Sequence, residues 1–403
     1  RNNLAWLRYF FICFTPLLMP FNVLLAFIIM LPYEQLNNKN YIIRAKRKIN
    51  KNKELIVIGI TGSYGKTSVK NILHTMLKQK YDVLSSPASY NTPMGLTKTI
   101  LKQLSDNHKI FIAEMGATCR GDIKYICDFV QPHIGIITST GSQHLESFKT
   151  LQNIKDTKYE LIEALPADGL AAFNGDSAQA MELYNKCPLP KIYTKTADDG
   201  GSFLRCENIV SQLKGIEFDL ILADETVRCK CSLVGKHNIS NILISAAVAY
   251  KLGLSLKEIA EAIWELQSVP HRLEVIQNKD ITIIDDSFNA SAEGTAAALE
   301  VLAEVAKGRK IVVTPGLVEL GALQNQENYN FGSNMAKVCD ICILVGENQT
   351  QPIFEGVIGG GFNKDSIITV NSLEDAKSEL NKILKSGDTV LFENDLPDNY
   401  SEQ

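Results

Sequence analysis

The sequence lacks the charge balance and the cysteine pattern of several large protein classes. Its 41 Lys and Arg residues are outnumbered by 45 Asp and Glu residues, which gives a formal net charge of −4. Because nucleic-acid-binding domains are usually basic, this balance predicts no nucleic-acid partner. The nine cysteines are odd in number and follow no disulfide-framework spacing, which indicates reduced thiols in a cytosolic protein body. Internal repeats and low-complexity tracts are also missing.

Long apolar runs are absent after residue 50, but one occupies residues 9–31. At about 1.5 Å per residue this run reaches about 35 Å as a helix, enough to span a hydrocarbon core. Pro16 and Pro20 leave a re-entrant or interfacial hairpin open, and a buried core helix is a further alternative. A basic cluster at residues 44–53 follows, and the positive-inside rule places it and the rest of the chain in the cytoplasm.

From residue 55 onward, apolar strands alternate with helical segments. This order is typical of an α/β fold in which helices cover both faces of a parallel sheet. Residues 203–234 alternate in a way that predicts an antiparallel appendage, and residues 268–271 resemble a linker. We therefore expect a membrane segment and basic linker (1–50), a central ATP-binding P-loop domain (51–270) and a Rossmann-like C-terminal domain (271–403).

The strongest single motif is Thr-Gly-Ser-Tyr-Gly-Lys-Thr-Ser at residues 61–68, between a predicted strand and a predicted helix. Its glycines allow backbone N–H groups to approach phosphate oxygens, and the helix N-terminus favours an anion. Lys66 can reach the β and γ phosphates, and Thr67 can bind Mg²⁺. Standard spacing would place a glycine where Ile60 stands. The motif predicts nucleotide binding but leaves kinases, GTPases, transporters and ligases open.

Three further residues are candidates for the same site. Glu114 ends a buried strand, where α/β sheets place their ligand sites, and its carboxylate suits Mg²⁺. His144 follows another strand end, although a single histidine is more often structural. Lys158 lies in the middle of a predicted helix, where a lysine is ordinarily solvated, so chemistry alone does not select it.

Taken in order along the chain, these motifs resemble the Mur ligase family of ATP-dependent amide ligases, and its MurF branch in particular. The resemblance covers roughly residues 55–395. It is carried by TGSYGKTS (61–68), AEMGATCRGDI (113–123), TSTGSQH (138–144), IKDTKYE (154–160), GKHNISN (235–241), HRLE (271–274), DDSFNAS (285–291) and VELG (318–321). Each motif is weak alone, whereas the ordered set is highly specific.

The resemblance implies a role for each candidate residue. ATP would be held by Thr61, Gly62, Ser63, Tyr64, Gly65, Lys66, Thr67 and Ser68, with Asn241 at the adenine and Arg272 and Asp286 at the ribose or phosphates. Thr67 and Glu114 would bind one Mg²⁺, and His144 would bind a second together with a carbamylated Lys158. The catalytic residues implied in this way are Lys66, His144 and Lys158.

The resemblance also implies a reaction and its substrates. ATP would convert the carboxyl of a cell-wall peptide precursor into an acyl phosphate, which an amino acid or dipeptide such as D-alanyl-D-alanine would attack. MurF enzymes carry a UDP-binding domain ahead of the phosphate loop, whereas an apolar segment stands there in this sequence. Residues 314–321 and 392–395 also differ from the MurF pattern. A poly-γ-glutamate-type or other membrane-associated ligase, a membrane-tethered P-loop ATPase and a non-catalytic scaffold therefore stay open, all at the cytoplasmic face of the membrane.

Overall fold

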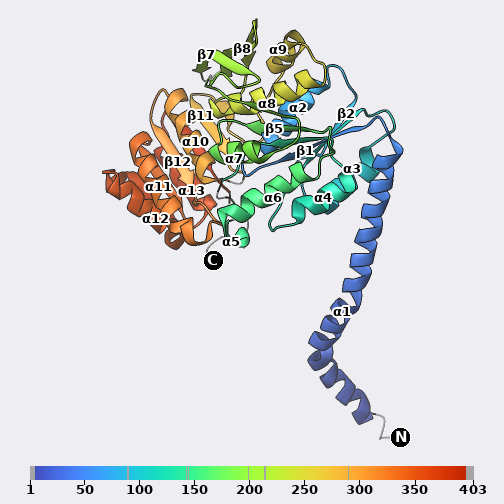
Figure 1. The fold of residues 1–403 in the computed structure, drawn as a ribbon. Helices are drawn as coiled ribbons and strands as arrows, with labels where there is room; N and C mark the ends of the chain where they lie inside the picture. Colours follow the sequence, from blue (N-terminus) through green and yellow to red (C-terminus); the bar gives the residue numbers. More distant parts are fainter. Residues whose placement is uncertain are drawn as a thin grey trace.

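The computed structural model describes residues 5–395 apart from positions 89, 142, 144, 198, 213, 214 and 289. Helix α1 (Ala5–Lys51) is 47 residues long and leaves the globular part of the molecule as a bent rod (Figure 1). Its length is about 70 Å at about 1.5 Å per residue. Ala45 and Ile49, near its end, are buried against helices α3 (Pro93–Gln103) and α4 (Asp122–Val130).

The central domain is built on a six-stranded sheet in which every described strand pair is parallel. The strands, in spatial order, are β2 (Val83–Ser85), β3 (Ile110–Glu114), β1 (Ile56–Thr61), β4 (Ile134–Ile137), β5 (Leu170–Asn174) and β6 (Lys191–Thr194). The middle strands are apolar and buried at nearly every position, because helices cover both faces of the sheet. The predicted parallel sheet is therefore confirmed.

Helices α2 (Lys66–Leu77) and α8 (His237–Lys251) cover one face of this sheet. Helices α3, α4 and α6 (Leu151–Glu163) cover the other, and the short helices α5 (Leu145–Phe148) and α7 (Ala178–Lys186) flank α6. The antiparallel appendage predicted at residues 203–234 is present as strands β7 (Arg205–Gln212), β8 (Gly215–Leu222) and β9 (Glu225–Cys231). It packs with helix α9 (Leu256–Trp264) onto α2 and α8.

The C-terminal domain has a second six-stranded sheet. Its spatial order is β10 (Glu274–Asn278), β11 (Ile281–Asp286), β15 (Thr389–Glu393), β12 (Lys310–Thr314), β13 (Ile341–Val345) and β14 (Ile367–Val370). Helices α10 (Ala292–Val305), α11 (Gln324–Val338) and α12 (Glu347–Gly359) cover one face, and α13 (Leu373–Ile383) covers the other. Two short 3-10 helices, η2 (Gly321–Leu323) and η3 (Lys364–Ser366), complete it.

The sheet of the C-terminal domain is mixed, because β10 runs antiparallel to β11. The sequence did not reveal this edge strand. It is short and mostly exposed, and its hairpin turn depends on Lys279, which adopts a positive φ of 55° that is uncommon for lysine. The other pairs in this sheet are parallel, as a Rossmann-like domain requires.

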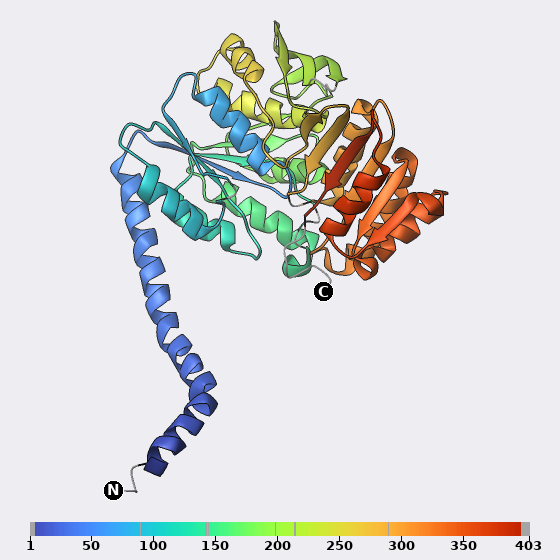
Figure 2. The ribbon, with the colours of Figure 1, turned by 180° about the vertical axis from the view of Figure 1, so that it is seen from behind.

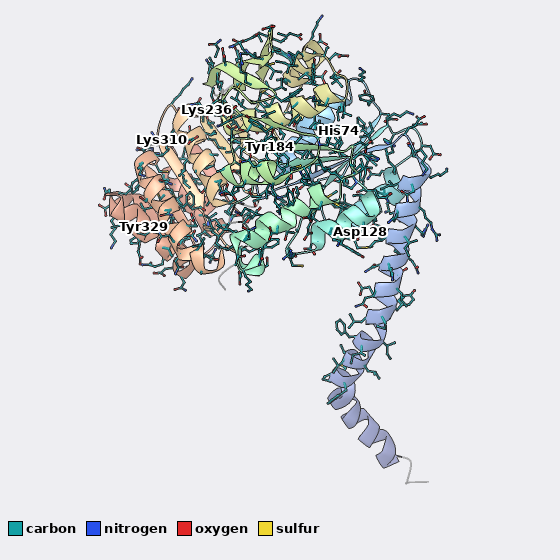
Figure 3. The ribbon with its side chains drawn as sticks, in the orientation of Figure 1. His74, Asp128, Tyr184, Lys236, Lys310 and Tyr329 are labelled. Atoms are coloured by element: carbon teal, nitrogen blue, oxygen red, sulfur yellow. The ribbon has the colours of Figure 1, made fainter. Side chains whose placement is uncertain are left out.

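The two domains lie directly against each other (Figures 1 and 2). Lys236, which Figure 3 labels at their junction, pairs with Glu304 at 3.0 Å. The backbone N–H of Glu146, in α5, donates to the carbonyl oxygen of Glu319 at 3.2 Å. As a result, the carboxyl ends of strands from both sheets face one shared space.

The eight described cysteines are free thiols, and seven of them are buried. This arrangement agrees with the prediction of reduced cysteines. Cys229 and Cys231 project into the core beneath the antiparallel appendage, and the described residues contain no cluster of three His, Cys, Asp or Glu side chains suited to a metal.

Candidate active site

A cavity of about 460 Å³ lies between the two domains. The phosphate loop and the carboxyl end of β3 form its central-domain side, and residues after the linker form the opposite side. Its lining includes Ser63, Tyr64, Gly65, Lys66, Thr67, Ser68, Asn91, Glu114, Asp122, Gln143, Lys158, His237, Asn238, Arg272, Asp286 and Phe288. A crevice at the carboxyl ends of parallel strands is where α/β folds bind their ligands.

The phosphate loop is shaped to receive an anion. Gly65 precedes α2 with a φ of +82°, a conformation that a residue with a Cβ rarely adopts. A Cβ at this position would lie 2.7 Å from Asn241 Oδ1, so the loop depends on glycine. The ammonium of Lys66 donates to the carbonyl oxygens of Gly62 (2.6 Å) and Ser63 (3.1 Å). The ammonium thus folds back over the loop where a phosphate would bind.

Glu114 lies within reach of the phosphate loop. Thr67 Oγ1 donates to Glu114 Oε1 at 3.1 Å, so the two predicted Mg²⁺ ligands are side by side. The other carboxylate oxygen lies 2.9 Å from the ammonium of Lys70, and both side chains are 1% exposed. Lys70 stands one helical turn after Lys66 and was not predicted, because a mid-helix lysine is usually solvated. It supplies a positive charge next to Glu114.

Lys158 is buried on the cavity side of α6, with 3% of its surface exposed. Burial lowers the pKa of Lys158 to about 7, and repulsion from Lys66 acts in the same direction. Glu160, on the same helix, accepts from the backbone N–H groups of Gly121 (2.8 Å) and Lys124 (2.9 Å). These two bonds tie α6 to the N-terminus of α4 and hold the helix that carries Lys158. Burial also lowers the pKa of Lys66 to about 8.

The C-terminal side of the cavity carries Arg272 and Asp286. Asp286 ends β11, and its Oδ1 accepts from the backbone N–H of Leu273 at 3.1 Å. The guanidinium of Arg272 lies over the ring of Phe288, 4.7 Å from its centroid. Burial raises the pKa of Asp286 to about 6, although Arg272 opposes the shift. The C-terminal side of the cavity thus presents a cation and a carboxyl to the phosphate loop.

The structure brings together most of the site residues predicted from the sequence, but three of them lie behind the cavity. Thr61 is fully buried and donates to the carbonyl oxygen of Met115, and Gly62 contributes its carbonyl to Lys66. The side chain of Asn241 packs against Gly65. His144 lies outside the described residues. Its role therefore stays a prediction.

Sequence reasoning missed His237 and Asn238, which line the cavity. Both stand in the GKHNISN segment, from which the sequence analysis selected Asn241. Asn238 Nδ2 donates to the carbonyl oxygen of Val234 at 2.8 Å, which holds the start of α8 in place. His237 lies near the Tyr64 ring, with centroids 6.1 Å apart, and burial lowers its pKa to about 4.

The residues present fit a nucleotide and a divalent cation. A glycine loop at a helix N-terminus with an adjacent lysine is a phosphate site. A threonine hydroxyl beside a buried carboxylate offers the oxygen ligands that Mg²⁺ prefers. The Lys70 ammonium next to Glu114 indicates that this position already accommodates positive charge.

Comparison with known proteins agrees with this geometry. The family model described as Mur ligase middle domain matches residues 60–249, and the model described as Mur ligase, glutamate ligase domain matches residues 271–393. The UDP-N-acetylmuramoyl-tripeptide--D-alanyl-D-alanine ligase of Escherichia coli is 29% identical over 334 residues, covering 82% of this chain and 74% of that enzyme. The ligase of the same name from Bacillus subtilis is 26% identical over 338 residues, covering 83% and 72%.

Solved structures with the same arrangement include MurF from Acinetobacter baumannii, with a TM-score of 0.80 and 24% identity. The match covers 89% of this chain and 77% of the MurF chain. The MurF ligase from Thermotoga maritima in complex with ADP has a TM-score of 0.77 and 26% identity, covering 89% and 80%.

Proposed function

This chain belongs to the Mur ligase family and is a MurF-like ATP-dependent ligase. We propose that it joins D-alanyl-D-alanine to a UDP-N-acetylmuramoyl tripeptide. The relatives described above carry the name of this reaction, and the cavity between the domains supports it with one phosphate site and room for further groups. The poly-γ-glutamate-type alternative is not favoured, because the relatives described above are named for D-alanyl-D-alanine addition.

The phosphate loop carries the proposal. A carboxylate is a poor electrophile, so the donor carboxyl is first phosphorylated by ATP, and the amine of the acceptor then displaces phosphate. Lys66 would hold the transferring phosphoryl group, because its ammonium lies against the backbone of the phosphate loop. Arg272 and Asp286 would reach the nucleotide from the other domain. Since both domains line the cavity, their closure would assemble the site and exclude water.

Two Mg²⁺ ions complete the proposed site. Thr67 and Glu114 would hold one Mg²⁺ ion, and His144 with Lys158 would hold a second. Bound Mg²⁺ neutralises charge on phosphoryl oxygens. Lys158 would bind as a carbamate, a modification that requires a neutral amine. Its lowered pKa of about 7 supplies that amine at neutral pH.

The assay for this proposal combines purified protein, ATP, Mg²⁺, the UDP-linked tripeptide and D-alanyl-D-alanine. We expect phosphate release that requires both organic substrates, together with a new amide detected by mass spectrometry. Replacing the dipeptide by glutamate is the control for acceptor class. Phosphate release that continues without any acceptor would contradict the ligase and support the tethered-ATPase alternative.

We propose further that α1 anchors the protein to a membrane, with the catalytic domains on the cytoplasmic side. The segment Met19–Lys51 has a mean hydropathy of 1.4 in its most apolar stretch, and none of that stretch is buried. Phe21 and Phe27 are 69% and 60% exposed. Such apolar exposure argues against the core-helix alternative and suits a lipid environment. The basic residues that follow would lie near anionic headgroups.

Flotation with lipid vesicles tests the anchor. We expect the full chain to float with the vesicles and to stay bound in high salt, because burial of apolar area is insensitive to salt. A variant that begins at residue 38 should stay at the bottom of the gradient while still binding nucleotide. A full-length chain that remains in the soluble fraction with vesicles would contradict the anchor without affecting the ligase proposal.

A further inference from the structure

Glu393, the last residue of β15, is a buried acid with no visible role in the site described so far. Its side chain is 0% exposed, and neither carboxyl oxygen accepts a hydrogen bond from a described residue. An ionised carboxylate without a partner is costly in a protein interior, and each such group requires an explanation. Glu393 stands in the segment 392–395, where the sequence departs from the MurF pattern.

The neighbour that provides an explanation is Asp286. The two residues are registered opposite each other on the parallel strands β11 and β15. Because neighbouring strands lie about 4.8 Å apart and registered residues project to the same face, the two side chains are neighbours on that face. Asp286 lines the nucleotide cavity, whereas Glu393 lies behind it. Of the two, Asp286 is the one that a nucleotide can touch.

The charges around this pair favour a single ionised carboxyl. Arg272 is the cation that acts on both acids, and Tyr64 from the phosphate loop and Glu293 from α10 also face this region. Two buried carboxyls next to one guanidinium do not both ionise readily. Burial and the neighbouring Asp286 raise the pKa of Glu393 well above its ordinary value. A proton on Glu393 would remove the repulsion between the two buried carboxyls.

We propose that Glu393 is a positioning residue that, as a neutral carboxylic acid, donates its O–H to the carboxylate of Asp286 and fixes it toward the nucleotide. The backbone N–H of Leu273 already holds Asp286 Oδ1 at 3.1 Å. A second donor would remove the remaining rotational freedom of the carboxylate. The inference rests on the proposed contact between Asp286 and the nucleotide, but not on the identity of the peptide substrates.

The experiment compares Glu393→Gln and Glu393→Ala by calorimetric binding of Mg²⁺·ADP at pH 7. Glutamine retains a neutral donor, so we expect its dissociation constant to stay within about threefold of the wild-type value. Alanine removes the donor, and we expect a loss of about tenfold, the usual effect of one hydrogen bond. Glu374→Gln, at an exposed position of α13, is the matched control, and thermal unfolding verifies that each variant is folded.

Two results would overturn the inference. If Glu393→Gln binds as weakly as Glu393→Ala, the ionised carboxylate is the active form and the shared proton is wrong. If Glu393→Ala binds as tightly as wild type, Glu393 does not influence Asp286. An infrared difference spectrum between wild type and Glu393→Gln gives an independent readout, because it should contain the C=O band of a protonated acid at neutral pH. Nucleotide binding needs no peptide donor or acceptor, so failure of the ligase assay would leave this test intact.

Discussion

Replacing Lys158 by methionine should abolish ligase activity and at the same time stabilise the protein. Lys158 is buried in the cavity wall with 3% exposure, and its pKa falls from 10.5 to about 7. At one pKa unit per about 1.4 kcal/mol, a shift of this size corresponds to a folding cost of at most about 5 kcal/mol. Methionine has a similar volume and carries no charge, so the variant would avoid most of that cost.

The sign of the pH dependence follows from the same shift. The pKa of Lys158 is lower in the folded state than in the unfolded state, so the unfolded chain binds more protons between about pH 7 and pH 10.5. Wild-type stability should therefore rise across that window through this group, and Lys158→Met should remove that rise. The advantage of the variant should be greatest below pH 7 and should vanish near pH 10.5.

Denaturant unfolding in bicarbonate-free buffer measures this effect, followed by the same titration with added bicarbonate. Bicarbonate should stabilise wild type if Lys158 forms a carbamate, and it should leave Lys158→Met unchanged. Lys155→Met is the control on the same helix, because Lys155 forms a surface pair with Glu182 at 2.6 Å and should contribute no more than about 1 kcal/mol. A Lys158→Met protein that is less stable than wild type at pH 7 would refute the reasoning.

Two further predictions concern the phosphate loop and its surroundings. Lys70→Met should lower stability by about 3–5 kcal/mol in thermal or denaturant unfolding, because it leaves Glu114 buried without its counter-ion. Added Mg²⁺ should recover part of that loss, and recovery no greater than in wild type would contradict Glu114 as a metal ligand. Gly65→Ala should weaken nucleotide binding at least tenfold, because its Cβ would meet Asn241 Oδ1 at 2.7 Å in a backbone conformation that favours glycine. Gly200→Ala is the control, because Gly200 also has a positive φ but no atom lies within 4 Å of the added Cβ, so this variant reports backbone strain without a clash. Equal nucleotide affinity in wild type and Gly65→Ala would contradict the role of the loop.

Much of the fold could be read from local patterns. Helix α2 and strands β13 and β14 begin and end where glycine, charge and apolar periodicity change sharply in the sequence. Strand β10 escaped detection, since a short, exposed edge strand contains little apolar signal. The Mur ligase motifs identified the reaction class from the residues expected to contact phosphate.

The sequence by itself therefore determined the phosphate loop, the parallel sheet and the family, since these depend on residues that are close in the chain. The tertiary structure decided which charges meet. Lys70 and Glu114 are 44 positions apart, and Asp286 and Glu393 are 107 positions apart, yet each pair is adjacent in the folded protein. Their burial sets their protonation and pairing, because desolvation depends on neighbours brought in by folding. For the same reason, the position of Lys158 in the middle of a helix suggested a solvated side chain, whereas the folded protein buries it and lowers its pKa.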